Sequence, residues 1–161
     1  MKESTELKGR YSDFIGEYSC VYSTEYCNEI IRGFDYYQDI DAVYCEDDQF
    51  ENSNAGRFDW ALDLHDMSPS MNGPVSQQMN EVLFECLEEY TQVFGHLKIV
   101  PFYSLAQKIQ KTPAGGGYHV WHDENSSVQE ARRSLVWMIY LNDDYEGGET
   151  EYLYYKKRIQ P

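Results

Sequence analysis

The chain has few cysteines, few basic residues and no long apolar segment. Its four cysteines are Cys20, Cys27, Cys45 and Cys86. They are scattered and form no C-x-x-C pair, so we expect reduced thiols rather than disulfides or a zinc site. No apolar run approaches the roughly 18 residues of a membrane-spanning helix, and the N-terminal residues lack the apolar centre of a signal peptide. These absences predict a soluble, cytoplasmic protein with no membrane partner.

The shortage of basic residues restricts the class of partner. Thirteen lysines and arginines stand against 28 aspartates and glutamates, which gives a formal net charge of -15. Binding to nucleic acid needs a basic face for the phosphates, and none is visible, so no nucleic-acid partner is expected. By contrast, 15 tyrosines and seven phenylalanines argue against disorder. A length of 161 residues suits one domain with its own core.

A first helix is predicted near the N-terminus. Residues 11–22 are expected to be an extended lead-in, and Ser23 is a candidate N-cap. After it, apolar residues that include Cys27, Ile30 and Phe34 recur at helical spacing.

A second, clearer helix is predicted between residues 76 and 94. Apolar residues keep three-and-four spacing over four turns from Met79 to Phe94, with Ser76 as a candidate cap and Gly95 as a stop. Such an apolar face has to be buried, and a sheet is its natural partner.

The segments between these helices are less regular. Residues 35–54 are acidic and polar, with a short strand at 42–44. Residues 58–65 have mixed periodicity and are left unassigned. Residues 67–74 contain two prolines and a glycine and predict a loop.

From residue 97 onward the pattern predicts short strands separated by turn residues. The predicted strands are 97–104, 106–112, 117–124, 134–142 and 150–155. Several short strands of this kind indicate a barrel or sandwich. The sequence therefore predicts a single domain in which a helical layer, residues 1–95, backs a β part, residues 96–161.

One glycine-rich stretch, residues 115–124, stands out as a candidate site. Three glycines lead into a short aromatic strand that ends in His122 and Glu124. Because side chains alternate along a strand, these two side chains should face the same way, with Asp123 turned to the other face. One imidazole and one carboxylate are two of the three ligands of the facial triad in non-haem Fe(II) oxygenases. A His-x-Glu pair also arises by chance in an acidic chain.

The wider context of this pair resembles a known family. The resembling segments are 110–124, 140–143 and 147–152, with a weaker similarity in 13–18 and 25–31. In this order and spacing they are similar to the prolyl 4-hydroxylase branch of the 2-oxoglutarate- and Fe(II)-dependent dioxygenases, in the compact form found in bacteria and their phages. The resemblance implies an α+β fold, with a double-stranded β-helix (jelly-roll) core and N-terminal helices packed on one sheet.

The resemblance also implies an activity. Members of the family use Fe(II), 2-oxoglutarate and O2, with ascorbate as a further cofactor, and release succinate and CO2. They hydroxylate a C–H bond, here expected in a prolyl or other residue of a peptide, with small molecules left open. The location would be the cytoplasm, or the host cytoplasm for a viral protein.

The family's functional residues are carried over only where this sequence matches them. His122 and Glu124 match the iron pair, in which Asp is the commoner carboxylate. Tyr140 matches a tyrosine that hydrogen-bonds the distal carboxylate of 2-oxoglutarate. Arg133 lies where relatives place a basic residue near the mouth of the site, and His119 where many have a tyrosine near the metal.

Each of these roles has an ordinary structural alternative. Glu124 could form a structural salt bridge, and Tyr140 could be an aromatic core residue. Arg133 could be solvated, and His119 could be an edge-strand histidine. Among the remaining candidates, Trp121 and Trp137 are expected to be core residues, and His65 and His96 are expected to be structural.

The sequence departs from the family at its C-terminal end. No histidine follows His122, whereas relatives have further strands with a second metal-binding histidine and a basic residue for 2-oxoglutarate. We therefore expect 1–161 to be an incomplete domain from an incomplete gene, a split gene or a trimmed chain. Two alternatives remain: a non-catalytic jelly-roll module that binds proteins through its aromatic surface, and a cupin-like metal protein without 2-oxoglutarate.

Overall fold

The computed structural model describes residues 7–47, 57–99, 101–104, 106–125, 127–128 and 130–161. The chain folds into two compact units. The first unit comprises residues up to 36 and residues 62–109, and the second comprises residues 37–61 and 110–161. The helical elements are α1 (Thr24–Asp39), η1 (Leu64–Asp66), α2 (Pro69–Val93) and η2 (Gly95–Ile99). The strands are β1 (Arg10–Ser12), β2 (Ile15–Glu17), β3 (Tyr44–Asp47), β4 (Arg57–Asp63), β5 (Lys108–Lys111), β6 (Gly117–Tyr118), β7 (Thr150–Tyr152) and β8 (Lys157–Ile159).

Helix α1 begins as its sequence predicts. The backbone N–H of Tyr26 donates to Ser23 Oγ at 3.2 Å, which confirms Ser23 as the N-cap. Tyr26, Ile30 and Phe34 recur every fourth residue and are all buried. Because such a spacing forms one stripe on a helix, this face enters the core of the first unit. Burial of one large apolar side chain contributes about 1.5–3 kcal/mol.

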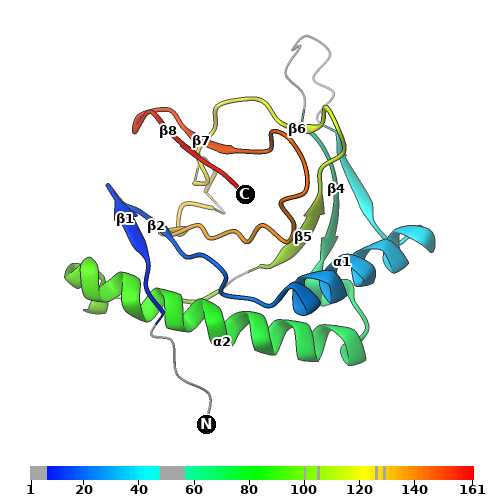
Figure 1. The fold of residues 1–161 in the computed structure, drawn as a ribbon, viewed down its shortest axis with the longest axis horizontal. Coiled ribbons are helices and arrows are strands. Elements are labelled where there is room, and N and C mark those ends of the chain that lie inside the picture. The colour runs from blue at the N-terminus through cyan, green and yellow to red at the C-terminus, as the bar shows by residue number, and fades with distance from the viewer. Residues whose placement is uncertain (1–6, 48–56, 100, 105, 126, 129) are drawn as a thin grey trace. The chain divides into compact units, whose positions relative to one another are not determined.

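In the first unit, α1 lies beside the N-terminal half of α2 (Figure 1). The Tyr26 hydroxyl donates to the carbonyl oxygen of Val75 at 2.7 Å. The two helices also approach closely at Gly33, where an added Cβ would lie 3.4 Å from Met71 Cε. Leu62 and Met79 are buried in the same unit. The core is therefore made by both helices and the end of β4.

Helix α2 begins at Pro69, so the loop predicted for this stretch was wrong. Ser68 is the N-cap and Pro69 lies in the first turn, where a proline has no helical N–H to lose. Gly73 and Pro74 lie inside the helix, and the missing N–H of Pro74 removes only one helical hydrogen bond. Ser76, the expected cap, instead donates to a side chain within the helix.

The C-terminal half of α2 carries the β1–β2 hairpin (Figure 1). Both carboxylate oxygens of Glu89 accept from the backbone N–H of Gly9, at 3.1 and 2.9 Å. The Tyr18 hydroxyl donates to the carbonyl oxygen of Cys86 at 2.8 Å. The helix ends at Val93, so the predicted stop just before Gly95 is confirmed. The lead-in predicted as extended instead turns back at Asp13 and Phe14 to form this hairpin, and these polar contacts hold it to α2.

Strand β4 is central in a four-stranded sheet of order β3-β4-β5, with β6 also paired to β4. β3 and β6 both run antiparallel to it. The adjacent residues Ala61 and Leu62 are both buried, so the sequence lacks the alternation typical of a half-buried strand. This is why the sequence left β4 unassigned. Its buried Asp59 accepts from Arg57 Nε at 2.9 Å and from Gln110 Nε2 at 3.2 Å.

Three predicted strands are present in shortened form. β5 confirms the centre of 106–112, β6 confirms only the first two residues of 117–124, and β7 confirms the start of 150–155. β7 pairs antiparallel with β8, which was not predicted. The short strand expected at 42–44 begins only at Tyr44.

Two strand predictions were wrong. Residues 97–99 belong to the 3-10 turn η2, and no strand follows among the described residues up to 104. Residues 134–142 form no strand and have no ladder partner. An apolar run supplies strand propensity, but a strand also requires a neighbour that accepts its hydrogen bonds. The described residues contain helices and antiparallel strands, and the double-stranded β-helix core stays a prediction.

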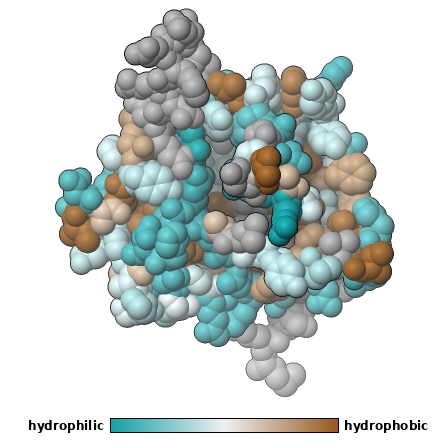
Figure 2. Space-filling model, turned by 180° about the vertical axis from the view of Figure 1, so that it is seen from behind, coloured by the Kyte–Doolittle hydropathy of each residue, from teal (hydrophilic) through white to brown (hydrophobic). Residues whose placement is uncertain are grey.

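Large apolar side chains are also exposed. On the face drawn in Figure 2, hydrophobic residues stand as separate brown patches among hydrophilic ones. The most exposed include Tyr154, Ile99 and Tyr103. Trp121 is also exposed, so its prediction as a core residue was wrong. Within the described part of the chain, no helix is long and apolar enough to cross a membrane.

Candidate metal site

The candidate site begins at the glycine turn of the second unit. Gly116 lies so close to β4 that an added Cβ would be 2.6 Å from the carbonyl oxygen of Phe58. Its neighbours Gly115 and Gly117 have positive φ angles of 77° and 128°, a region that favours glycine. The three glycines therefore let the chain turn against β4 and start β6. Only glycine fits at the middle position without a shift of backbone.

His122 and Glu124 come together beyond this turn, as the sequence predicts, although their segment is not a strand. His122 Nε2 lies 3.3 Å from Glu124 Oε1. The other ring nitrogen, Nδ1, lies 2.9 Å from the carbonyl oxygen of Val120. The imidazole also stacks on the Tyr118 ring, with centroids 3.9 Å apart and planes inclined by 26°. Two contacts thus fix the imidazole: a backbone acceptor at Nδ1 and an aromatic ring below.

Arg133 binds the same carboxylate from the other side. Its Nη1 lies 3.3 Å from Glu124 Oε2 and 3.1 Å from Glu130 Oε1. The guanidinium therefore contacts one carboxylate oxygen of Glu124, and His122 contacts the other, Oε1. The side chains are exposed by 40% for Arg133 and 46% for Glu124. At that exposure an ion pair contributes at most about 1 kcal/mol, so it orients the carboxylate more than it stabilises the fold.

The remaining two predicted residues have separate surroundings. His119 is exposed and its imidazole lies over Gly117, where an added Cβ would be 3.3 Å from its Cε1. The Tyr140 and Thr150 hydroxyl groups hydrogen-bond at 2.6 Å, and Thr150 also donates to Met138 Sδ at 3.3 Å. Tyr140 therefore already has a partner from β7.

The pKa of Tyr145, which lies near Tyr140, is shifted. The pKa of Tyr145 is raised, first by burial and then by Tyr140 and the carboxylates of Asp143 and Asp144. Tyr145 therefore keeps its proton at neutral pH and can act there as a hydrogen-bond donor.

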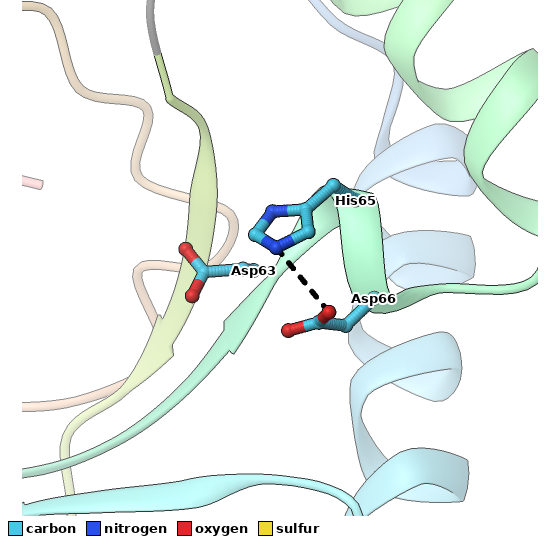
Figure 3. A group of neighbouring side chains, drawn as sticks. All are labelled: Asp63, His65 and Asp66. Carbon is cyan, nitrogen blue, oxygen red and sulfur yellow. Dashed lines mark ion pairs between the residues drawn. The ribbon is translucent and has the colours of Figure 1, made fainter.

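A second group of possible ligands lies in the first unit. Asp63, His65 and Asp66 each offer one donor atom, and these atoms all lie within 4.8 Å of one another (Figure 3). Sequence reasoning took His65 as structural and missed this group. The available signal was the Asp-x-His-Asp spacing at residues 63–66. Within the described part of the chain, it is the one group of three such residues this close together.

No protein-family model, curated protein or solved structure matches this chain. The resemblance to the dioxygenases therefore rests on the motifs in residues 110–124, 140–143 and 147–152.

Proposed function

We propose that His122 and Glu124 are iron ligands of a 2-oxoglutarate-dependent dioxygenase of the prolyl 4-hydroxylase type. The observation that carries the proposal is the pair of atoms His122 Nε2 and Glu124 Oε1, 3.3 Å apart. The carbonyl oxygen of Val120 accepts a hydrogen bond, so Nδ1 carries the proton. In the neutral imidazole, Nε2 then presents a lone pair toward the lone pairs of the carboxylate. A cation between them, either a metal ion or a second ring proton, is needed to make that approach favourable.

The residues fit a divalent metal ion. Bonds of about 2.0–2.2 Å from one ion to a nitrogen and an oxygen place two neighbouring donor atoms about 3 Å apart, close to the observed separation. A metal-binding histidine usually donates its other N–H to a backbone carbonyl or a carboxylate, and Val120 supplies that acceptor. Of the two carboxylate oxygens of Glu124, Arg133 contacts Oε2, so Oε1 remains available as a single-oxygen ligand.

The proposed site needs one further protein ligand. Two ligands hold Fe(II) weakly, because Fe(II) stands low in the affinity order of divalent metals and depends on a preformed site. His122 is the last histidine of the 161 residues. The proposal thus assigns two of the three ligands and leaves the third unassigned.

The remaining roles follow from the proposal. Bound Fe(II) with 2-oxoglutarate and O2 supplies the oxidising chemistry, and the protein binds, orients and excludes water. Tyr140 would donate its O–H to the distal carboxylate of 2-oxoglutarate, with the Thr150 hydroxyl then donating to the Tyr140 oxygen in place of Met138. Arg133 would orient Glu124, and His119 would act near the metal or on the substrate side. Ascorbate would serve as a reductant. The substrate class is a C–H bond of a prolyl or other residue in a peptide, or of a small molecule.

The experiment is an assay of Fe(II)-dependent succinate formation from 2-oxoglutarate with a proline-rich peptide. Wild type is compared with His122→Ala and Glu124→Ala, and Asp123→Asn serves as the matched control. We expect succinate formation by wild type and the control and its loss in the two ligand variants. Unchanged turnover in both ligand variants would refute the site assignment. No turnover by wild type would refute catalysis by this chain.

The non-catalytic binding module is the second candidate function. It is favoured by the pairing of Glu124 with Arg133, which gives the carboxylate a partner other than a metal ion. Exposed aromatic side chains such as Trp121 and Tyr154 would supply the binding surface. A wild-type chain that binds no Fe(II) and forms no succinate supports this function over the dioxygenase.

A further inference from the structure

The second cluster of ligand atoms lies where β4 meets η1. Asp63 is the last residue of β4, and His65 and Asp66 belong to the 3-10 turn that follows. Figure 3 shows Asp63 and Asp66 on either side of the His65 imidazole. His65 Nε2 lies 3.3 Å from Asp66 Oδ1, and one donor atom from each of the three residues lies within 4.8 Å of the others.

The backbone beneath this cluster is well anchored. Leu64 and Met67, which flank His65 and Asp66, are buried with 4% exposure each. The Leu64 N–H donates to the carbonyl oxygen of Gln107 at 3.0 Å, and the Met67 N–H donates to Leu64 at 3.2 Å. Because the backbone is fixed, a ligand would order only the three side chains, which lowers the entropic cost of binding.

The side chains themselves remain accessible. His65 and Asp66 are exposed by 77% and 58%, and Asp63 is half-buried. An ion could therefore reach the cluster from solvent and keep water as further ligands. Two carboxylates beside one imidazole also give the cluster a negative charge, which attracts a cation.

We propose that Asp63, His65 and Asp66 bind a divalent first-row transition-metal ion, for which Zn²⁺ is the probe. A mixed set of one nitrogen and two oxygens suits such ions, since imidazole is a ligand for zinc, copper, iron and nickel. Calcium and magnesium prefer sites made of oxygen alone, with six or more ligands. Three protein ligands also leave an open position, which water or another small ligand occupies. This site lies in the first unit and does not depend on the function proposed for His122 and Glu124.

The test is a Zn²⁺ titration of the whole chain by calorimetry in a His122→Ala background, which removes the other imidazole–carboxylate pair. We expect one Zn²⁺ per chain. In this background, His65→Ala, Asp63→Asn and Asp66→Asn should each weaken binding by about tenfold or more, roughly the change that one lost interaction of moderate strength produces. His96→Ala, which removes another exposed histidine, should leave the affinity unchanged. The proposal is overturned if the His122→Ala chain binds no Zn²⁺, or if the three cluster variants bind Zn²⁺ with the same affinity as the His122→Ala chain.

A second measurement needs no variant of the cluster. The ring signals of His65 in nuclear magnetic resonance spectra of the wild-type chain should shift as Zn²⁺ is added, and those of His96 should not. A His65 ring that does not respond at saturating Zn²⁺ contradicts the proposal even where the variants fold poorly.

Discussion

His122 Nε2 faces Glu124 Oε1 at 3.3 Å, and the same imidazole is held from its other nitrogen by the carbonyl oxygen of Val120. A ring fixed in this way has one nitrogen committed to the backbone and one directed at a carboxylate. A hydrogen bond from the second ring nitrogen to a backbone carbonyl orients a metal-binding histidine in the same way. It is also the arrangement of a protonated imidazole in a surface ion pair, so the identity of the cation between the two atoms decides the function.

Gly116 should be the least replaceable glycine of the candidate site. In Gly116→Ala the new Cβ would lie 2.6 Å from the carbonyl oxygen of Phe58, which forces β4 and the glycine turn apart. We expect a loss of about 1–3 kcal/mol in the free energy of unfolding, the usual range for local strain. Urea denaturation followed by circular dichroism measures it.

Gly73 is the matched control for that substitution. An added Cβ at Gly73 meets nothing within 4 Å, and the residue lies inside α2. Gly73→Ala should therefore stabilise the protein by about 0.5–1 kcal/mol, because alanine favours the helix. Equal destabilisation by both substitutions would contradict the close approach at Gly116.

The core of the first unit should depend on Phe34. Its side chain is 2% exposed on the buried face of α1, so Phe34→Ala should lower the free energy of unfolding by about 3–5 kcal/mol. Phe84→Ala, on an exposed position of α2, is the control and should change stability by about 0.5 kcal/mol or less. If the two variants unfold at the same urea concentration, the assignment of the α1 core face is wrong.

The Cys86 thiol should make stability depend on alkaline pH. Burial, with the carboxylates of Glu89 and Glu85 adding to it, raises the pKa of Cys86 from 9.0 to about 11. A group whose pKa is raised by folding stabilises the protein below its unfolded pKa and loses that contribution as pH rises through the folded pKa. Stability should therefore fall between pH 9 and 11. The contribution is on the order of 1 kcal/mol, once solvent screening of this partly exposed group is allowed for.

The measurement compares urea unfolding of wild type and Cys86→Ala at pH 8 and at pH 10.5. The variant should lose less stability over this interval than wild type does. Cys20→Ala, which removes an exposed thiol, should behave as wild type. A pH dependence that is identical in all three proteins would show that Cys86 is not the group responsible.

The sequence predicted the features that depend on neighbours along the chain. The N-cap Ser23, the core positions Ile30 and Phe34, and the stop before Gly95 all follow from helical spacing and capping, whereas the buried Tyr26 was not predicted. It failed where a residue pattern has two physical meanings. Pro69 was interpreted as a loop residue, although a proline in the first turn of a helix costs no hydrogen bond.

Features that depend on distant partners were harder to predict. Central strand β4 was unassigned because Ala61 and Leu62 are both buried. Residues 134–142 have the apolar pattern of a strand but no strand beside them, among the described residues, to pair with, and a local pattern does not show whether such a partner exists. In the candidate site, the convergence of His122 and Glu124 was predicted from spacing. The contact of Arg133 with Glu124 was missed, because it joins residues nine positions apart across an irregular segment.

The most direct test is anaerobic equilibrium dialysis of the wild-type chain against Fe(II), beside His122→Ala, Glu124→Ala and Asp123→Asn. If His122 and Glu124 share a metal ion, wild type and Asp123→Asn bind Fe(II) with equal affinity at this pair, and the two ligand variants lose that binding. If the two atoms share only a proton, all four proteins bind Fe(II) equally or not at all, and the dioxygenase proposal fails.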